Sequence, residues 1–161
     1  MSLFVPDAES MEALGQQLSD PACWRGVVWL QGDLGAGKTT LVRSLLRGLG
    51  YPGRVKSPTY TLLEPYELDD RMVYHLDLYR LASPDELEWL GIRDLLTDTD
   101  LLLVEWPERG EGVLPGADLD IVIDHADEGR WLSAHAMTER GKRMLASLPL
   151  PDPEFTSLYC G

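Results

Sequence analysis

The sequence predicts an α/β fold in which helices cover both faces of a mixed central sheet. Residues 27–30 and 101–104 are short, continuous apolar runs, which are typical of strands buried on both faces. Residues 119–124 instead carry leucine and isoleucine at every second position, which predicts a half-buried strand. A sheet with both kinds of strand is expected to be mainly parallel at its centre, with an antiparallel edge.

The first half of the chain supplies two helices around the first buried strand. Residues 10–18 place apolar side chains on one helical face, and Ser10 can cap the start of this helix. The strand at residues 27–30 ends close to a glycine. Residues 39–49 then carry a leucine stripe and stop at another glycine, as an amphipathic helix does.

The second half adds strands and a closing helix. Residues 60–63 and 72–78 predict two extended segments, and an Asp-Asp pair between them predicts a turn. Ser83, followed by proline and acidic residues, marks a helix start. Residues 130–137 can pair with the alternating strand as a hairpin, and residues 138–148 predict the last helix.

Length and composition favour one domain in a reducing compartment. The 161 residues predict a single domain over residues 1–148, followed by a proline-rich tail over residues 149–161 that we expect to be mobile. Two widely separated cysteines do not suggest a disulfide framework, and no apolar run is long enough to span a bilayer. Because the start also lacks a secretory signal pattern, we expect a cytoplasmic protein without a membrane partner.

The charge excludes one class of function. The formal net charge is −13, and the excess of acidic residues lies after residue 60. Nucleic-acid phosphates require Lys and Arg to replace their counterions. Direct wrapping of nucleic acid is therefore disfavoured. Such a charge could steer basic partners towards the chain, but a merely well-solvated surface is the better explanation of it.

The motif with the clearest chemistry lies between the first buried strand and the second helix. Residues 32–39, GDLGAGKT, match the P-loop pattern G-x-x-x-x-G-K-[ST]. Its glycines let successive backbone N–H groups point inward around a phosphate, and the following helix adds the positive end of its dipole. Lys38 can reach the β- and γ-phosphates, and the Thr39 hydroxyl can bind Mg²⁺. The expected architecture is therefore a three-layer domain like that of P-loop NTPases.

Two acids can complete a metal site. Glu105 follows the strand at residues 101–104 at the carboxyl end of the sheet, so it is the candidate metal ligand, directly or through water. A solvated acid at a strand end is the alternative. Asp77 lies in an alternating run and could hold the metal's water or orient the attacking water. It could instead pair with Arg80 or Lys56.

Other polar residues are less informative. Residues 57–60 offer hydroxyls, including that of Thr59, on a loop preset by proline, and such a loop can sense the γ-phosphate. A plain surface turn fits this segment equally well. His75, His125 and His135 have no metal-ligand spacing, so we expect them to be structural.

Four segments together resemble the bacterial TsaE (YjeE) family, the small P-loop ATPases of tRNA threonylcarbamoyladenosine biosynthesis. They are GDLGAGKTTL, VKSPTYTL, HLDLYRL and VEWP, which occur in the family's order and spacing. The resemblance covers about residues 7–148. It implies slow hydrolysis of ATP with Mg²⁺, in association with the TsaD–TsaB complex and in one pathway with TsaC. It also implies that the protein contacts tRNA only indirectly, through that complex.

The resemblance also implies site residues. Thr39 and Glu105 would bind the metal, and Lys38, Asp77 and Thr59 would be catalytic. The N-terminal segment around Ala8 would pass the nucleotide base, and Arg130 would pack near it. The nucleotide-binding set is Ala8, Leu34, Gly35, Ala36, Gly37, Lys38, Thr39, Thr40 and Arg130.

Three functional hypotheses remain open from the sequence. The first is an ATPase required for the threonylcarbamoyl group on N6 of adenosine 37 in tRNAs that read ANN codons. The second is a small-molecule kinase, which the absence of an arginine-rich lid disfavours. The third is a nucleotide-sensing adaptor. A guanine-specific N-K-x-D motif is excluded because the chain contains no asparagine.

Overall fold

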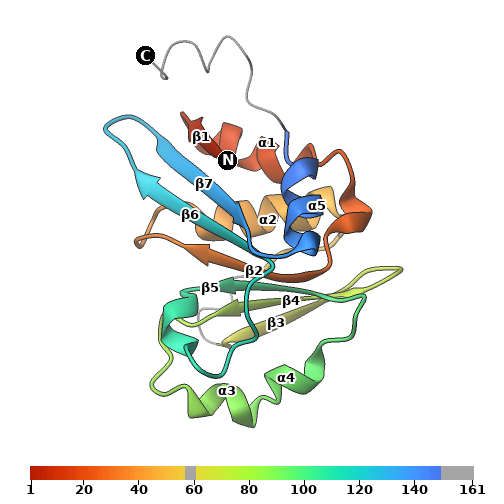
Figure 1. Cartoon of the computed structure of the whole chain (residues 1–161). Helices are drawn as coiled ribbons and strands as arrows, with labels where there is room; N and C mark the ends of the chain where they lie inside the picture. The colour runs from red at the N-terminus through yellow and green to blue at the C-terminus, as the bar shows by residue number, and fades with distance from the viewer. Residues whose placement is uncertain (57–60, 150–161) are drawn as a thin grey trace.

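The computed structural model describes residues 1–56 and 61–149. Within these residues, seven strands form one sheet in the order β1-β7-β6-β2-β5-β4-β3 (Figure 1). The strands are β1 Ser2–Val5, β2 Gly26–Gln31, β3 Leu63–Glu67, β4 Met72–Asp77, β5 Leu101–Glu105, β6 Leu119–His125 and β7 Arg130–Ala136.

The sheet is parallel in its middle and antiparallel towards both sides. Strand β2 pairs in parallel with β5 and β6, and β5 pairs in parallel with β4. The pairs β6–β7, β7–β1 and β3–β4 are antiparallel. The predicted mixed α/β sheet is thus confirmed, with antiparallel pairing at both edges where one edge was expected.

Helices cover both faces of this sheet (Figure 1). The helices α1, α2 and α5 lie on one face, and α3 and α4 lie on the other, so the predicted three layers are present. Short 3-10 turns occupy Pro21–Cys23 and Pro107–Gly110. The helices are α1 Ala8–Gln16, α2 Lys38–Gly48, α3 Asp85–Trp89, α4 Ile92–Leu95 and α5 Glu139–Ser147.

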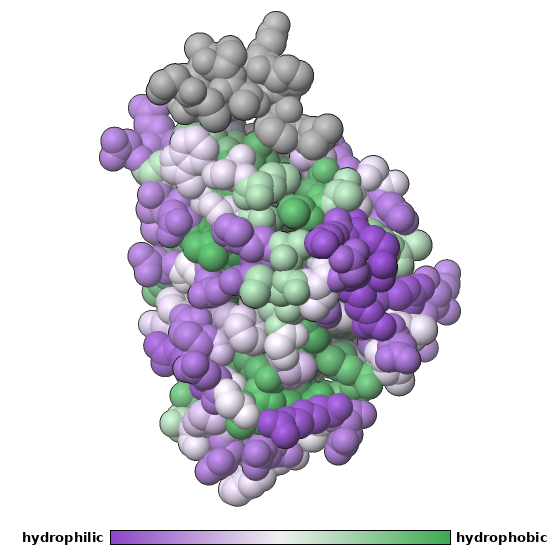
Figure 2. All heavy atoms as spheres, viewed as in Figure 1, coloured by the Kyte–Doolittle hydropathy of each residue, from purple (hydrophilic) through white to green (hydrophobic). Residues whose placement is uncertain are grey.

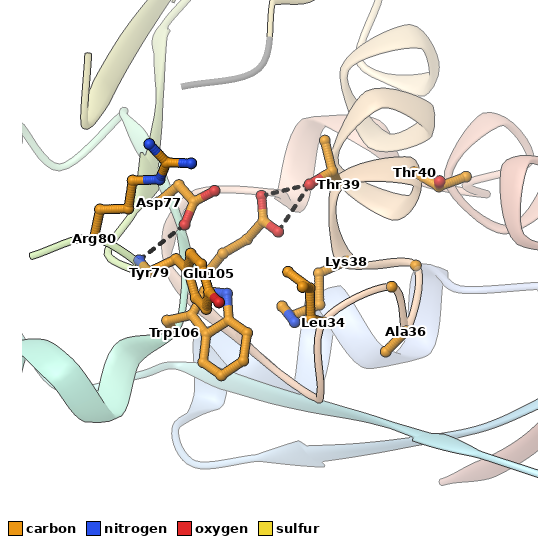
Figure 3. A pocket seen from close by; sticks show the side chains of 12 residues that line it. Leu34, Ala36, Lys38, Thr39, Thr40, Asp77, Tyr79, Arg80, Glu105 and Trp106 are labelled. Carbon is orange, nitrogen blue, oxygen red and sulfur yellow. Dashed lines mark hydrogen bonds between the residues drawn. The ribbon is translucent and has the colours of Figure 1, made fainter. Parts of the chain in front are cut away.

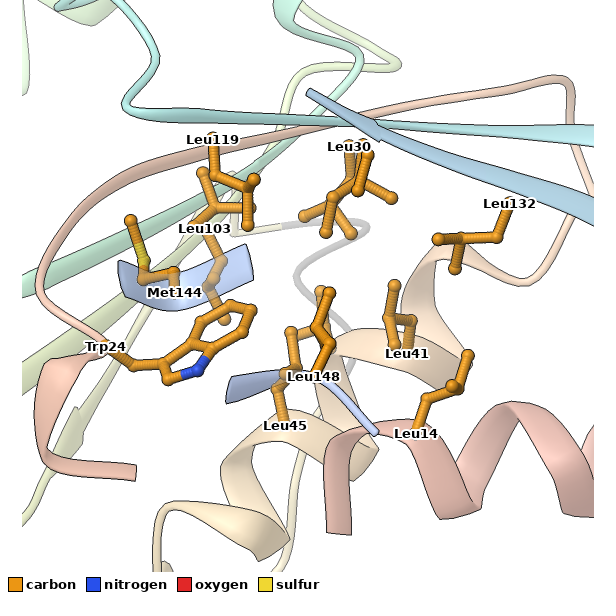
Figure 4. Close-up of a cluster of buried hydrophobic side chains, with 14 of the residues drawn as sticks. Leu14, Trp24, Leu30, Leu41, Leu45, Leu103, Leu119, Leu132, Met144 and Leu148 are labelled. Carbon is orange, nitrogen blue, oxygen red and sulfur yellow. The ribbon is translucent and has the colours of Figure 1, made fainter. Parts of the chain in front are cut away.

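The larger core fills the space between the sheet and helices α1, α2 and α5 (Figure 4). Alternate residues of a strand point to opposite faces, so Leu101 and Leu103 enter this core, whereas Leu102 and Val104 enter the smaller core beneath α3 and α4. The continuous apolar run of β5 therefore follows from burial on both faces, as predicted. The labelled members of the larger core are Leu14, Trp24, Leu30, Leu41, Leu45, Leu103, Leu119, Leu132, Met144 and Leu148.

Helices α1 and α2 approach each other unusually closely through two glycines. A Cβ atom added to Gly48 would lie 1.8 Å from the carbonyl oxygen of Gly15, and one added to Gly15 would lie 2.3 Å from the amide nitrogen of Leu45. Neither position can accept a side chain unless the helices move apart. This contact joins the C-terminal parts of α1 and α2, and the first turns of the two helices also lie close together, since Ala8 and Thr40 line one pocket.

Several element boundaries differ from the predicted ones. The α1 cap is Asp7 and not Ser10, because the Asp7 carboxylate accepts the Ser10 amide at 2.8 Å. The strand expected at residues 60–63 lies later, at β3, where Pro65 is tolerated because β3 is at the edge of the sheet. Strand β1 was not predicted at all. The tail residues 150–161 lie outside the described part of the chain.

The surface is mixed in character. Figure 2 shows hydrophilic and hydrophobic side chains interspersed over one face of the molecule. None of the helices in residues 1–56 and 61–149 combines the length and the apolarity that crossing a bilayer requires.

Candidate functional site

The loop between β2 and α2 forms a cradle of backbone groups at the carboxyl end of the central strand. Gly35 and Gly37 have φ angles of 77° and 109°, in the left-handed region that favours glycine. Gly37 is the N-cap of α2 and supplies no capping side chain. The first amides of α2 are therefore available to a ligand, and the helix dipole favours an anion there.

Lys38 lies inside this loop and not at the surface. It is 4% exposed, and its Nζ atom donates hydrogen bonds to the carbonyl oxygens of Gly32 and Asp33, the latter at 3.0 Å. The same atom lies 4.2 Å from the ring centre of Trp106, a favourable cation–π distance. Burial lowers the pKa of Lys38, and the nearby Glu105 carboxylate is the largest opposing influence.

Glu105 joins the first turn of α2 to the end of β5. Thr39 Oγ1 donates to Glu105 Oε1 and Oε2, at 2.9 and 3.1 Å (Figure 3). His75 Nε2 lies 2.6 Å from Glu105 Oε2. Glu105 is 2% exposed and has polar partners on both sides, so the alternative of a solvated strand-end acid is wrong.

Asp77 lies beside Glu105 on the neighbouring strand. The two residues are paired in the β4–β5 register, and each ends its strand. Asp77 Oδ1 accepts the Tyr79 amide at 3.0 Å. Burial, followed by the charge of Glu105, raises the pKa of Asp77 despite this hydrogen bond.

These side chains line one open pocket of about 510 Å³ (Figure 3). It brings together Lys38, Asp77 and Glu105 from three elements that are far apart in the sequence. Its lining also includes Tyr79, Arg80 and Trp106, for which the sequence patterns predicted no nucleotide contact. The full lining is Leu34, Gly35, Ala36, Gly37, Lys38, Thr39, Thr40, Asp77, Tyr79, Arg80, Glu105 and Trp106.

A second pocket of about 240 Å³ continues from the first. The two share Gly35, Ala36, Gly37 and Thr40, so they lie on either side of the same loop. Ala8 and Arg130 line only the second pocket, where Arg130 Nη2 lies 3.3 Å from the Gly35 carbonyl oxygen. Its full lining is Val5, Pro6, Asp7, Ala8, Met11, Gly35, Ala36, Gly37, Thr40, Gly129 and Arg130.

The structure therefore places all but one of the predicted site residues along two connected pockets. The exception is Thr59, which lies outside the described residues, so its role stays a prediction. Within residues 1–56 and 61–149, no group of three or more His, Cys, Asp or Glu side chains could hold a metal ion by itself. A hydroxyl and a carboxylate, here Thr39 and Glu105, suit an ion such as Mg²⁺ that takes its other ligands from phosphate and water.

Two neighbours of the site were not singled out from the sequence. His75 was expected to be structural, yet it contacts the candidate metal ligand. It precedes Asp77 by two residues in an alternating run, so a shared face could have been read from the pattern. Trp106 has a φ of 58°, rare for a tryptophan, and nothing in its sequence context signals this turn.

Comparisons with known proteins agree with this arrangement. The family model described as "Threonylcarbamoyl adenosine biosynthesis protein TsaE" matches residues 5–132, which is most of the chain. The chain belongs to the TsaE family. The resemblance found in its four sequence motifs is thus confirmed.

Curated members of the TsaE family align over much of their length. The Haemophilus influenzae protein is 44% identical over 152 residues, covering 91% of this chain and 96% of the relative. The Synechocystis protein is 44% identical over 113 residues, covering 68% and 71%. The Bacillus subtilis protein is 38% identical over 127 residues, covering 78% and 79%. Each is named tRNA threonylcarbamoyladenosine biosynthesis protein TsaE.

A solved structure supports the fold independently. The crystal structure of Bacillus subtilis YdiB superposes with a TM-score of 0.67 and 27% sequence identity, covering 91% of each chain. The sheet and helices of this TsaE-family chain are therefore arranged as in that solved structure.

Proposed function

We propose that this chain is an ATP-binding and ATP-hydrolysing factor for tRNA threonylcarbamoyladenosine formation. It would act in the cytoplasm with the TsaD–TsaB complex, in one pathway with TsaC, and would meet tRNA only through that complex. Membership of the TsaE family supports the pathway. The observation that carries the ATPase part is the pair of hydrogen bonds from the Thr39 hydroxyl to the Glu105 carboxylate, beside the loop between β2 and α2 that would bind phosphate.

The residues present suit a magnesium–nucleotide. The α2 amides and the Lys38 ammonium would bind phosphate oxygens, because both offer hydrogen-bond donors and positive charge at one place. The Thr39 hydroxyl and the Glu105 carboxylate would hold Mg²⁺, directly or through water. When bound, Mg²⁺ neutralises charge on the phosphate oxygens and makes the γ-phosphorus easier to attack.

The second pocket fits the remainder of the nucleotide. Because it continues from the phosphate loop past Gly35 and Thr40, a ligand with its phosphates on α2 would extend its sugar and base towards Ala8 and Arg130. The Arg130 Nε atom is buried and has no hydrogen-bond partner among the described residues, so it remains available to a polar group of the ligand.

We assign to Asp77 the role of positioning the water that attacks the γ-phosphate. It lines the pocket beside Glu105, and its carboxylate keeps acceptor positions besides the one that takes the Tyr79 amide. It would orient that water and accept a proton from it. This role for Asp77 would distinguish an ATPase from an adaptor that only senses nucleotide.

The test measures ATP hydrolysis by the chain with and without purified TsaD–TsaB complex, alongside modification of a substrate tRNA in a reconstitution that also contains TsaC. We expect slow ATP hydrolysis by the chain alone, faster hydrolysis with TsaD–TsaB, and modification of tRNA over many turnovers only when the chain is present. Asp77→Asn should lose both activities, whereas Asp98→Asn, a change at a fully exposed site, should lose neither. Full tRNA modification by an Asp77→Asn variant without hydrolysis would favour the adaptor, and rapid phosphorylation of an added small-molecule acceptor would favour the kinase.

A further inference from the structure

His75 lies beneath the candidate metal site, in the interior of strand β4. Its side chain is fully buried, and its Nε2 atom is 2.6 Å from Glu105 Oε2. Because His75 precedes Asp77 by two residues, both side chains point to the α2 face of the sheet. The imidazole therefore approaches Glu105 from the side of the sheet, whereas Thr39 approaches it from the helix.

The position of the imidazole proton follows from its surroundings. The Nδ1 atom is buried and has no hydrogen-bond partner among the described residues. A proton on Nδ1 of a neutral ring would leave a buried N–H unpaired and would turn the Nε2 lone pair towards the carboxylate. A proton on Nε2 avoids both costs. We therefore assign Nε2–H as the donor and Glu105 Oε2 as the acceptor.

With this hydrogen bond, the Glu105 carboxylate accepts donors from two different elements. The carboxylate accepts the Thr39 hydroxyl from α2 and the His75 ring N–H from β4. With donors anchored on two different elements, the carboxylate has little freedom to rotate. Groups that hydrogen-bond to a metal ligand fix its orientation in this way, and losing one typically weakens metal affinity about 10- to 100-fold.

We propose that His75 is a positioning residue that fixes the Glu105 carboxylate for Mg²⁺ binding with the nucleotide. This inference rests on the proposed function, since it needs Glu105 to be a metal ligand. This positioning role differs from a purely structural role in one respect. Metal binding would depend on the hydrogen-bond donor of His75 and not on the volume of its ring.

The experiment compares the wild-type chain with His75→Gln and His75→Met. Glutamine keeps an N–H donor at about the position of Nε2, whereas methionine fills space without a donor. The matched control is His135→Met, because His135 is exposed on β7. The readout is the dissociation constant of Mn²⁺ in the presence of saturating ADP, measured by electron paramagnetic resonance. A second readout is ADP affinity in EDTA.

We expect His75→Met to weaken Mn²⁺ binding about 10- to 100-fold. We expect His75→Gln and His135→Met to stay near the wild-type value and ADP affinity in EDTA to be unchanged in all variants. Glu105→Gln gives the loss caused by removing the ligand itself. Equal Mn²⁺ binding in wild type and His75→Met would overturn the inference, and so would an equal loss in His75→Gln and His75→Met.

A measurement on the wild-type chain removes the dependence on variant folding. Long-range ¹H–¹⁵N correlation spectra of the imidazoles report which ring nitrogen carries the proton. We expect Nε2–H for His75, and an Nδ1–H tautomer would overturn the inference. Wild-type chain that binds neither ADP nor Mn²⁺ would instead refute the proposed function, so the two failures are distinguishable.

Discussion

Thr39 and Glu105, which lie 66 residues apart in the chain, share a bifurcated hydrogen bond of 2.9 and 3.1 Å. This contact requires α2 to start immediately after the phosphate loop and β5 to end beside β2. Both conditions follow from the parallel pairing of β2 with β5, in which Leu30 is opposite Glu105. The central strands therefore set the geometry of the candidate metal site.

Lys38→Met should weaken ATP binding about 10- to 100-fold, because charge-assisted hydrogen bonds to phosphate would be lost. Titration calorimetry with a non-hydrolysable ATP analogue and Mg²⁺ measures this loss. The control is Lys142→Met, which removes an exposed lysine on α5 that pairs with Glu139. Equal affinity in wild type and Lys38→Met would remove Lys38 from the binding site.

Asp77→Asn should reduce ATP turnover about 100-fold or more, the usual contribution of a positioned acid or base. Nucleotide affinity should change little, because Asp77 lies beside the metal site and is not part of the phosphate loop. Single-turnover hydrolysis, measured alongside the calorimetric titration, separates the two quantities. Parallel losses of affinity and turnover would place Asp77 among the binding groups.

The central elements and most of the site residues were predictable from the sequence because their signals are local. The β5 run is apolar at every position, and the phosphate loop has a fixed spacing. The α1 cap was misassigned because Asp7 and Ser10 are both good capping residues, and only the backbone geometry chooses between them. Strand β1 was missed because four residues at an edge give too short a pattern.

Contacts between distant elements were not predictable. No local pattern shows that His75 meets Glu105, since that contact depends on the β4–β5 register. The close approach of Gly15 to Gly48 likewise depends on how α1 packs against α2. Such contacts arise only in the tertiary structure, so the sequence patterns did not predict them.

Gly48→Ala should destabilise the fold by about 1–3 kcal/mol, the usual cost of overpacking. In an unhindered helix the same change would stabilise by roughly 0.5–1 kcal/mol, so the sign itself is diagnostic. The physical cause is the Gly15 carbonyl oxygen, 1.8 Å from the new Cβ position. Urea unfolding measures the change. Gly116→Ala is the control, because no heavy atom of residues 1–56 and 61–149 lies within 4 Å of its Cβ position.

Asp100→Asn should lower the free energy of unfolding by about 1–3 kcal/mol at neutral pH, because an NH₂ group would face a backbone donor. The Asp100 carboxylate accepts the Met72 amide at 2.9 Å and the Thr97 amide at 3.1 Å. Burial raises the pKa of Asp100, but these hydrogen bonds outweigh it and hold the pKa below the ordinary 3.8.

The pH dependence of that effect has a definite sign. Because the pKa of Asp100 is lowered in the folded state, its contribution is fully present above pH 3.8 and is lost as the pH falls through the lowered value. The stability difference between wild type and Asp100→Asn should therefore be constant from pH 7 to 5 and shrink below about pH 4. A difference that grows on acidification would contradict this assignment.

The most direct test is an NMR titration of the wild-type chain with a non-hydrolysable ATP analogue and Mg²⁺. We expect saturable shifts of the Gly35, Gly37 and Lys38 amides together with that of Arg130, which would place one nucleotide along both pockets. The absence of saturable binding, or shifts confined to residues outside these pockets, would contradict the account.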